Sequence, residues 1–570
     1  MSADFRCRLI KDSRLADITD SLDYAVMSGA SSSTFQQFNA ITSSSSSIVY
    51  NVQIPSESIV VSREVLIQSQ LTLRIHITDV PVGETAFNYG KTDAFQAFPL
   101  NSLFTTISST INNTNVSCNL QDVKDALLRL NKSRELCKYN GFTPTLPDDH
   151  WYNYYQGDDT LSNPLGSYSG SLIDVNELPR GAHPLDDITI IHKGLEDDED
   201  DSLVSQSLDD TWDITITATF TEPLLGLSPF IFGEPEYNCQ GLAGINVMNF
   251  VMNIDGACKR VFSTSSSAGT YTVSLPPNPF TNPRLLLNFL STQASDLIPS
   301  RNVVPYMDFP RYLSMSANGQ PFQSEQSGTL NSQNIQLNQL PDYFIVFVRK
   351  PMSQQGARDS SSFWKIKGVS INLSNQSGLL SSATPQDLWR ISVANGSHQS
   401  WIEFSGDANC NVNETGKGTT ISTTGSLLIL SPARDLSLPD YCSSGSIGQF
   451  SIQMSIQVQA PRFYRDNYTE VQEIVIIPVL SGIFVSCMGQ SNIYTGILTK
   501  QMVLDAKEKK SDSPVSSSEY RRMVGGKLHH HGMSMIKKFP FTKHSSGGSF
   551  SGGASTSGGA GIPSKLSKYY

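Results

Sequence analysis

Apolar and polar residues alternate strictly along several segments of this chain. In residues 450–459, which read FSIQMSIQVQ, apolar residues occupy the even positions and uncharged polar residues the odd ones. The same alternation returns in residues 212–221 (WDITITATFT) and 71–78 (LTLRIHIT). Because successive side chains of a β-strand point to opposite faces, each segment is expected to bury one face only. The pattern predicts a mainly β protein built from antiparallel sheets, and it favours a structural or binding role.

Further strand patterns fall into two groups along the chain. The first group comprises residues 47–53, 59–78, 212–221, 243–254 and 270–275. The second group comprises residues 343–349, 364–373, 426–430, 449–459, 473–480 and 482–486. Each group offers roughly eight strand candidates, which predicts two tandem antiparallel β-sandwiches. No repetition of individual residues is visible between the groups.

Two short helices are expected in the connections between strands. Residues 120–130 show apolar helical spacing, and Asn119 can serve as the N-cap. A second helix is expected after Thr384, which can be its N-cap, with Pro385 at the first helical position and Asp387 at the third.

The domain organisation follows from these groups and from the segments that lack periodicity. The expected parts are an N-terminal arm (1–45), a first sandwich (46–335) with a large loop insertion at about 137–210, a second sandwich (336–506) and a disordered tail (507–570). Within this scheme residues 292–340 are a polar connection, and a last helix begins at Thr499 and grades into the tail. The insertion is rich in Tyr, Gly, Pro and Asp, and a segment of that length without periodicity is usually functional or disordered.

Charge is scarce and unevenly distributed over the 570 residues, of which only 16% are Asp, Glu, Lys or Arg. Residues 24–56 contain no charged residue. Uncharged polar surface suits a face that packs against copies of the same chain, because charged groups are costly to desolvate at the core of an interface. For residues 30–46 a low-complexity linker is an equally good interpretation.

The tail carries eleven Lys and Arg against three acidic residues, although the whole chain has a formal net charge of −11. The basic residues expected to contact nucleic acid are Arg521, Arg522, Lys527, Lys537 and Lys538. Flexible cations neutralise phosphates without reading sequence. A solubility tail or a membrane-surface contact are the alternatives.

Motifs for catalysis or for metal binding are weak. The eight cysteines include no CxxC pair, and the nine histidines include no HExxH motif. His76 is expected to be a solvated surface residue, and residues 416–420 (GKGTT) are expected to form a turn rather than a phosphate loop. The acidic run at 196–201 reads as a solvated loop, and the aromatic run at 151–155 as either loop packing or a sugar-stacking surface. We therefore expect no enzymatic activity, no cofactor and no metal.

Secretion and membrane insertion are not expected either. The N-terminal segment lacks the apolar run of a signal peptide, and the longest apolar run, residues 474–487, is too short to span a bilayer. The expected product is soluble and is made in the cytosol, with mostly buried free thiols.

Several stretches resemble the double jelly-roll major capsid proteins of the polinton, adintovirus and virophage kind. The resembling stretches are residues 94–123, 221–233, 241–250, 363–396, 425–458 and 474–506. The resemblance implies two tandem eight-stranded jelly rolls and a homotrimer with a six-sided outline that tiles an icosahedral virion shell. It also implies contacts with neighbouring trimers and with penton or minor capsid proteins, an outward loop at 137–210 and a tail that faces the interior.

One further resemblance is local. Residues 523–527 (MVGGK) are similar to the sites cut by adenovirus-type maturation proteases, which implies cleavage between Gly526 and Lys527. A flexible linker that contains Gly-Gly is the alternative.

Two other classes of protein compete with the capsid interpretation. A β-sandwich attachment or carbohydrate-binding protein would need exposed aromatic platforms, and a secreted glycosidase would need two carboxylates in a groove. The sequence shows no convincing example of either.

Overall fold

The computed structural model describes the two groups of strands but not every residue between them. The described residues are 5–11, 23–29, 31–56, 58–81, 86–90, 92–130, 188–193, 211–230, 241–258, 260–264, 266, 269–292, 301–315, 321–410, 419–436, 438, 443–463 and 469–496. The helix expected at Thr499, the tail, residues 416–418, the acidic run and the aromatic run all lie outside them.

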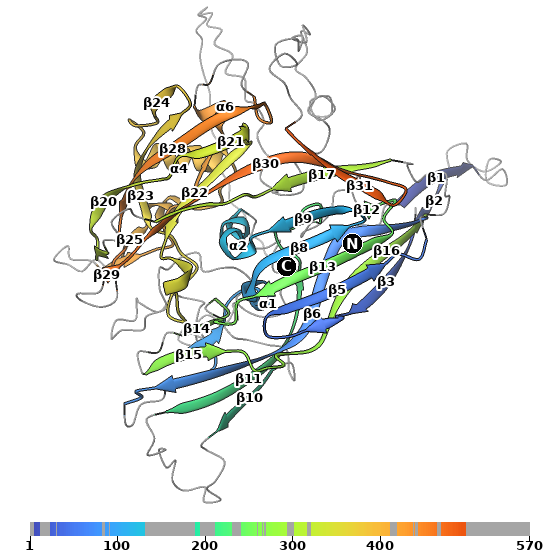
Figure 1. Ribbon diagram of the computed structural model, residues 1–570, viewed down its shortest axis with the longest axis horizontal. Coiled ribbons are helices and arrows are strands. Elements are labelled where there is room, and N and C mark those ends of the chain that lie inside the picture. The colour runs from blue at the N-terminus through green and yellow to red at the C-terminus, as the bar shows by residue number, and fades with distance from the viewer. Residues whose placement is uncertain are drawn as a thin grey trace, which may run out of the picture. The chain divides into compact units, whose positions relative to one another are not determined.

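The first block consists of two facing antiparallel sheets (Figure 1). One sheet has the order β10-β11-β6-β16-β3, with bounds Ile188–Lys193, Trp212–Pro223, Ile59–Thr78, Phe280–Thr292 and Ser31–Asn39. Two short strands, β12 (Gly241–Leu242) and β15 (Thr270–Ser274), also pair with β6. The other sheet has the order β4-β5-β13-β8-β9, with bounds Thr42–Ser43, Ser47–Gln53, Val247–Ile254, Phe104–Ile111 and Thr114–Cys118.

The second block is also a pair of antiparallel sheets. One sheet has the order β17-β30-β22-β27, with β18 and β31 also on β30, and bounds Asn302–Asp308, Glu473–Cys487, Tyr343–Arg349, Leu428–Leu430, Tyr312–Met315 and Gln490–Thr495. The other has the order β20-β28-β23-β24, with β21 also on β28, and bounds Ser327–Asn331, Ile447–Gln459, Lys365–Leu373, Gln376–Leu379 and Ile335–Gln339.

Short helices and smaller sheets complete the described part. The helices are α1 (Pro99–Leu103), α2 (Leu120–Arg129), η4 (Met352–Gln354), α4 (Pro385–Ala394), α5 (Trp401–Ser405) and α6 (Pro432–Asp435). The two-stranded sheets pair β1 (Phe5–Lys11) with β2 (Asp23–Gly29), β7 (Asp93–Phe95) with β14 (Phe262–Thr264), β19 (Phe322–Gln323) with β29 (Thr469–Glu470), and β25 (Asp407–Cys410) with β26 (Thr419–Ser422).

The two blocks repeat one topology, although their sequences show no repetition. The sheet order β3-β16-β6-β11 of the first block corresponds strand for strand to β17/β18-β30-β22-β27 of the second. The corresponding strands also follow one another in the same order along the chain. The order β5-β13-β8-β9 corresponds in the same way to β20/β21-β28-β23-β24. In both blocks a helix directly follows the edge strand that ends this second sheet order, α2 after β9 and α4 after β24. The two expected sandwiches are therefore two copies of one fold.

The alternating patterns predict burial correctly. In β28, Ile452, Met454 and Ile456 have no exposed surface, and the Gln and Ser residues between them are partly or fully exposed. β11 and β6 follow the same rule over the segments where the alternation was seen. Both connecting helices also form, and Thr384 and Asp387 make the expected capping box of α4. Asn119 is the N-cap residue of α2, but its side chain makes no capping hydrogen bond.

The expected irregular arm over residues 1–45 is wrong where the structure describes it. Residues 31–39 form β3, which pairs along its whole length with β16 and extends the first sheet. The sequence of β3, SSSTFQQFN, shows no alternation because an edge strand needs few buried side chains. Within the expected loop at 137–210, residues 188–193 form β10, which pairs with β11.

The expected boundary at residue 335 is also wrong. Strands β17, β18 and β20, all placed before that boundary by the sequence, pair with β30 and β28 of the second block. The sequence pattern is weak at β20 and β21 because each strand has only five residues and because Ser, Thr, Asn and Gln occupy their exposed positions. The second block therefore begins near residue 301.

Candidate functional site

The sheet β17-β30-β22-β27 is buried on both of its faces. Along β22, Phe344, Val346 and Val348 belong to the core of the second block. The intervening Ile345 and Phe347 belong to a different cluster, which contains the core of the first block. β30 divides in the same way, since Ile474 and Ile476 face one core and Val475, Ile477 and Val479 the other. We call the contact made by the second set of side chains the junction.

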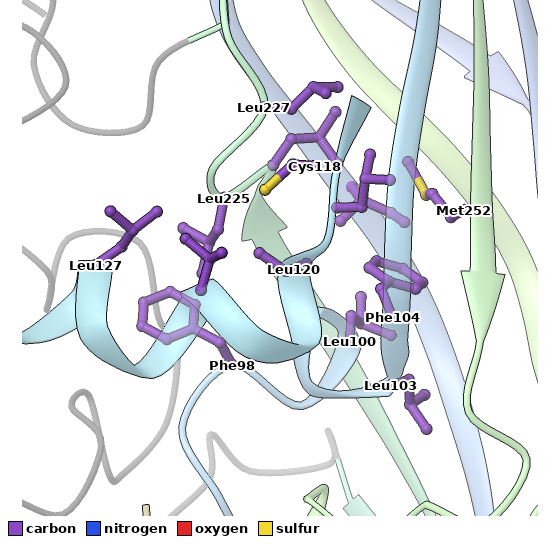
Figure 2. Packing of buried hydrophobic residues seen from close by; sticks show 14 of the residues in the cluster. Phe98, Leu100, Leu103, Phe104, Cys118, Leu120, Leu127, Leu225, Leu227 and Met252 are labelled. Carbon is purple, nitrogen blue, oxygen red and sulfur yellow. The ribbon is translucent and has the colours of Figure 1, made fainter. Parts of the chain in front are cut away.

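Helix α2 and strand β9 form the first-block side of the junction. Figure 2 shows Leu120 and Leu127 on α2, with Cys118 of β9 and Leu225 beside them. All four side chains are at least 95% buried, with exposures of 0%, 4%, 5% and 1%. Burial of this kind contributes about 25 cal/mol per Å² of apolar area removed from water. One buried apolar cluster contains these four side chains together with Ile345, Phe347, Val475 and Ile477 of the second block, so the two blocks are joined by apolar packing.

The polar side of α2 is buried as well, and its charges are paired across the junction. Arg349 of β22 donates through Nη2 to the Asp122 carboxylate, and its Nε lies 2.9 Å from Glu473 Oε1. Arg311 pairs with the other carboxylate oxygen of Asp122. The side chains of Asp122, Arg349 and Glu473 have exposures of 7%, 4% and 7%. Arg349 and the two carboxylates thus lie together out of water, and Arg311, with 34% of its side chain exposed, lies at their edge.

A second ion-pair group lies one turn further along α2. Arg260 Nη2 lies 2.6 Å from Asp125 Oδ2. Burial works to raise the pKa of Asp125, but the charges of Arg260, Lys124 and Arg129 outweigh it and hold that pKa well below its usual range. Arg260 and Arg129 also donate to Ser361, so this group ties the first block to the second.

Hydrogen bonds between side chains and the main chain close the junction at its other end. Ser491 of β31 donates through Oγ to the carbonyl oxygen of Ile111, at 2.5 Å, and through its amide to Asn113 Oδ1, at 2.8 Å. Thr114 of β9 donates through Oγ1 to the carbonyl oxygen of Ser491, also at 2.5 Å. These contacts fix β31 against β9.

The outward faces of two of the sheets are polar but carry few charges. The five strands β4, β5, β13, β8 and β9 contain no Asp, Glu, Lys, Arg or His. Their outward side chains are Ser, Thr, Asn, Gln and Val, most of them half-buried. The outward face of β28 is likewise made of Ser and Gln. Such faces can be desolvated against protein at low cost.

The sequence-predicted site residues do not gather into a site in the described structure. The tail residues Arg521, Arg522, Gly526, Lys527, Lys537 and Lys538 lie outside the described residues. His76 is 48% exposed, as expected, and its Nδ1 lies 2.7 Å from Asp213 Oδ1. Over the described ranges, no three His, Cys, Asp or Glu side chains lie together as a metal site would need. In the same part of the chain, no helix is both long and apolar enough to cross a bilayer.

Cys118, Cys258 and Cys487 are free thiols. Burial raises the pKa of Cys118 and of Cys258 to about 12, so both stay protonated and inert at neutral pH. This agrees with the expectation of buried structural thiols.

Sequence reasoning missed the junction and its charges. A signal for it was present in YFIVFV (343–348) and IVIIPV (474–479), which are apolar without alternation. A continuous apolar strand indicates burial on both faces. The partners of Arg349 could not be found this way, because Asp122 lies more than two hundred residues earlier.

Comparison with known proteins gives matches over most of the chain. Residues 3–290 match the family model of the Sputnik virophage major capsid protein first domain, and residues 309–482 match that of the major capsid protein V20 C-terminal domain. The two matches meet near the boundary that the strand pairing gives. A Sputnik virophage protein described as capsid protein V20 is 26% identical over 532 residues, which is 91% of this chain and 84% of that protein.

Solved structures agree on the fold. A chain in the cryo-EM structure of the Sputnik virophage is 24% identical, with a TM-score of 0.71 over 88% of this chain and 96% of that one. The crystal structure of the mavirus major capsid protein is 14% identical, with a TM-score of 0.63 over 86% of this chain and 96% of that one. The two blocks are thus two jelly rolls, and the attachment protein is not favoured. With a family model matching half of its length, this chain belongs to the Sputnik virophage major capsid protein family and is a structural protein of the capsid.

Proposed function

We propose that the chain forms homotrimers of six-sided outline, and that these trimers tile an icosahedral shell. The observation that carries this proposal is the repeated topology, in which one strand order occurs twice in one chain. Three such chains present six copies of one fold, which supports a nearly six-fold arrangement. The proposal assigns the chain no catalytic step and no cofactor.

The junction supports this proposal physically. Because the two jelly rolls of a chain are joined by apolar packing and buried ion pairs, each chain acts as one building block. The low charge of the remaining sheet faces then suits them to contacts between blocks, which in obligate assemblies often bury more than about 2,000 Å².

The direct test uses the full-length protein. Native mass spectrometry is expected to give a species of three 62.4-kDa chains, and negative-stain microscopy is expected to show six-sided particles or closed shells. A chain that stays monomeric at high concentration contradicts the proposal.

We further propose that residues 507–570 face the shell interior and contact packaged nucleic acid. Their excess of eight positive charges supports this placement, and the contacts would come from Arg521, Arg522, Lys527, Lys537 and Lys538. Binding of a DNA duplex should then weaken steeply with salt, by roughly one power of ten in affinity per power of ten in salt for each phosphate neutralised. A chain ending at residue 506 should lose this binding. Within the shell, neighbouring trimers and penton or minor capsid proteins are the proposed partners, and residues 137–210 are proposed to form an outward loop.

The sequence MVGGK at 523–527 supports a maturation cleavage between Gly526 and Lys527. The measurement is the intact mass of the chain from purified particles. A mass that ends at Gly526 supports cleavage, and a full-length mass rejects it.

A further inference from the structure

The internal repeat predicts two equivalent contacts between jelly rolls, and the chain makes only one of them with itself. The outward face of β22 and β30 is covered by α2 and β9 of the first block. In the repeat, β6 and β16 correspond to β22 and β30, whereas α4 and β24 correspond to α2 and β9. A chain with two copies of one fold can make this contact once internally. The second contact, between the β6–β16 face and the α4 region, needs another copy of the chain.

The β6–β16 face carries apolar side chains that no part of the described chain fully covers. Leu286 and Leu290 of β16 are only half-buried, whereas Leu285 and Leu287 between them belong to the core. Directly opposed residues of antiparallel strands share a face. Leu286 is opposed by Leu66, and Phe35 of β3 opposes the adjacent Asn288, so all lie on one surface. We call Phe35, Leu66, Leu286 and Leu290 the β16 patch.

The most exposed member of the β16 patch lies on the edge strand β3. Phe35 has 65% of its surface exposed. Some polar groups beside it bond within the sheet, since Ser33 Oγ lies 2.5 Å from Asn288 Oδ1 and Arg284 Nη1 lies 2.7 Å from Gln37 Oε1. A partner that covers the patch therefore breaks no ion pair of the described residues, and it has to bring an acceptor to the Arg284 guanidinium, whose Nε has no partner within the described chain.

Helices α4 and α5 differ from α2 in how much of them is covered. Nine of the ten residues of α2 are buried, but only Leu388 and Ser392 of α4 are. Val393 of α4 is 37% exposed and Ile402 of α5 is 55% exposed. We call Val393 and Ile402 the helix patch. The covered helix of the first block thus has an uncovered counterpart in the second.

We propose that the helix patch of one chain docks on the β16 patch of a second copy, in an arrangement equivalent to the junction. This inference rests on the proposed trimer and states which surfaces hold it together. Repeating one contact around a ring uses the internal junction and the proposed contact in alternation, which gives a closed assembly with no exposed copy of either surface.

Photocrosslinking of the full-length protein tests the proposal. A benzophenone amino acid at position 35 should crosslink to residues 385–405 of another chain, identified by mixing ¹⁴N- and ¹⁵N-labelled protein. The matched control places the same probe at Ile191, which lies on the outward face of the same sheet at its other edge and is 45% exposed. This control probe should not reach residues 385–405.

The outcomes separate this inference from the proposed trimer. Trimers whose position 35 crosslinks to residues 1–29, to the tail, or to any segment other than 385–405 overturn the proposed contact and leave the trimer intact. A chain that does not self-associate overturns both.

Substitutions supply a second measurement. Phe35→Asp and Ile402→Asp should each raise the dissociation constant of the trimer by about 100-fold, because a charge would have to be desolvated at the centre of a contact. Ile191→Asp should leave it within about threefold. All three sites are exposed in the chain, so circular dichroism should show an unchanged fold. Equal effects of all three substitutions contradict the proposal.

Discussion

At the scale of single residues, the buried charges of the junction set the largest individual energies. Arg349 is bonded to two carboxylates on different elements, Asp122 of α2 and Glu473 of β30. Removing one partner of a buried ion pair costs more than the pair itself contributes, because the remaining charge keeps its desolvation penalty. The position of Arg349 therefore matters more for stability than any exposed charge.

Arg349→Met is accordingly expected to lower the free energy of unfolding by about 3 kcal/mol. Urea denaturation of the full-length protein measures this loss. The matched control is Arg390→Met on α4, where the side chain is 69% exposed and lies 3.7 Å from Asp387; its effect should stay below about 0.5 kcal/mol. Similar urea midpoints for the two variants would show that Arg349 contributes no more to stability than an exposed arginine does.

A single buried carboxyl, that of Asp93, should also make the free energy of unfolding depend on pH. Burial raises the pKa of Asp93 from 3.8 to about 6, although the amide of Asn88 and the hydroxyl of Thr92 donate to its Oδ2. The folded state therefore holds a proton that the unfolded state has already released. Its stabilising effect is complete below pH 3.8 and is lost as the pH rises to about 6.

Asp93→Asn removes this titration while keeping the shape of the side chain and one carbonyl acceptor. Between pH 3.8 and 6 the stability of the variant, relative to the unchanged protein, should rise by about 3 kcal/mol, which is the energy of the pKa difference. Urea midpoints of both proteins across this range measure it. Parallel curves would mean that Asp93 ionises in the folded state at the same pH as in the unfolded state.

At the scale of elements, local sequence signals are sufficient wherever one local interaction decides the structure. The alternation in β28 and the capping box of α4 could both be predicted because their causes lie within a few residues. β3 and β20 could not, because an edge strand is defined by the partner it pairs with and not by its own pattern. The junction could not be predicted for the same reason, because its two sides lie far apart in the sequence.

The cap of α4 gives a prediction at this scale. Thr384 Oγ1 accepts from the amide of Asp387, and the Asp387 carboxylate accepts from the amide of Thr384. Thr384→Ala should therefore destabilise the protein by about 1 kcal/mol and speed amide hydrogen exchange in the first turn of α4. Thr384→Ser keeps the hydroxyl and should restore both values. Slow exchange in the Ala variant would show that tertiary contacts alone hold the helix.

At the scale of the whole molecule, the two jelly rolls depend on one another. The side chains Ile345, Phe347, Val475 and Ile477 are at most 1% exposed in the chain because the first block covers them. A second block produced alone, residues 301–496, would present these side chains to water as one apolar face. Continuous exposed apolar surface of this kind binds hydrophobic dyes and promotes aggregation.

The isolated second block should therefore bind anilinonaphthalene sulfonate and aggregate, whereas the full-length protein should do neither. Replacing Phe347 and Ile477 by Lys in the isolated block should restore solubility, because both face away from its own core. The matched control replaces Phe344 and Ile476 by Lys. Because both side chains face that core, this control should unfold the block instead. A soluble isolated block without dye binding would mean that the junction contributes little. In that case the two jelly rolls would be separate domains on a common chain rather than one building block.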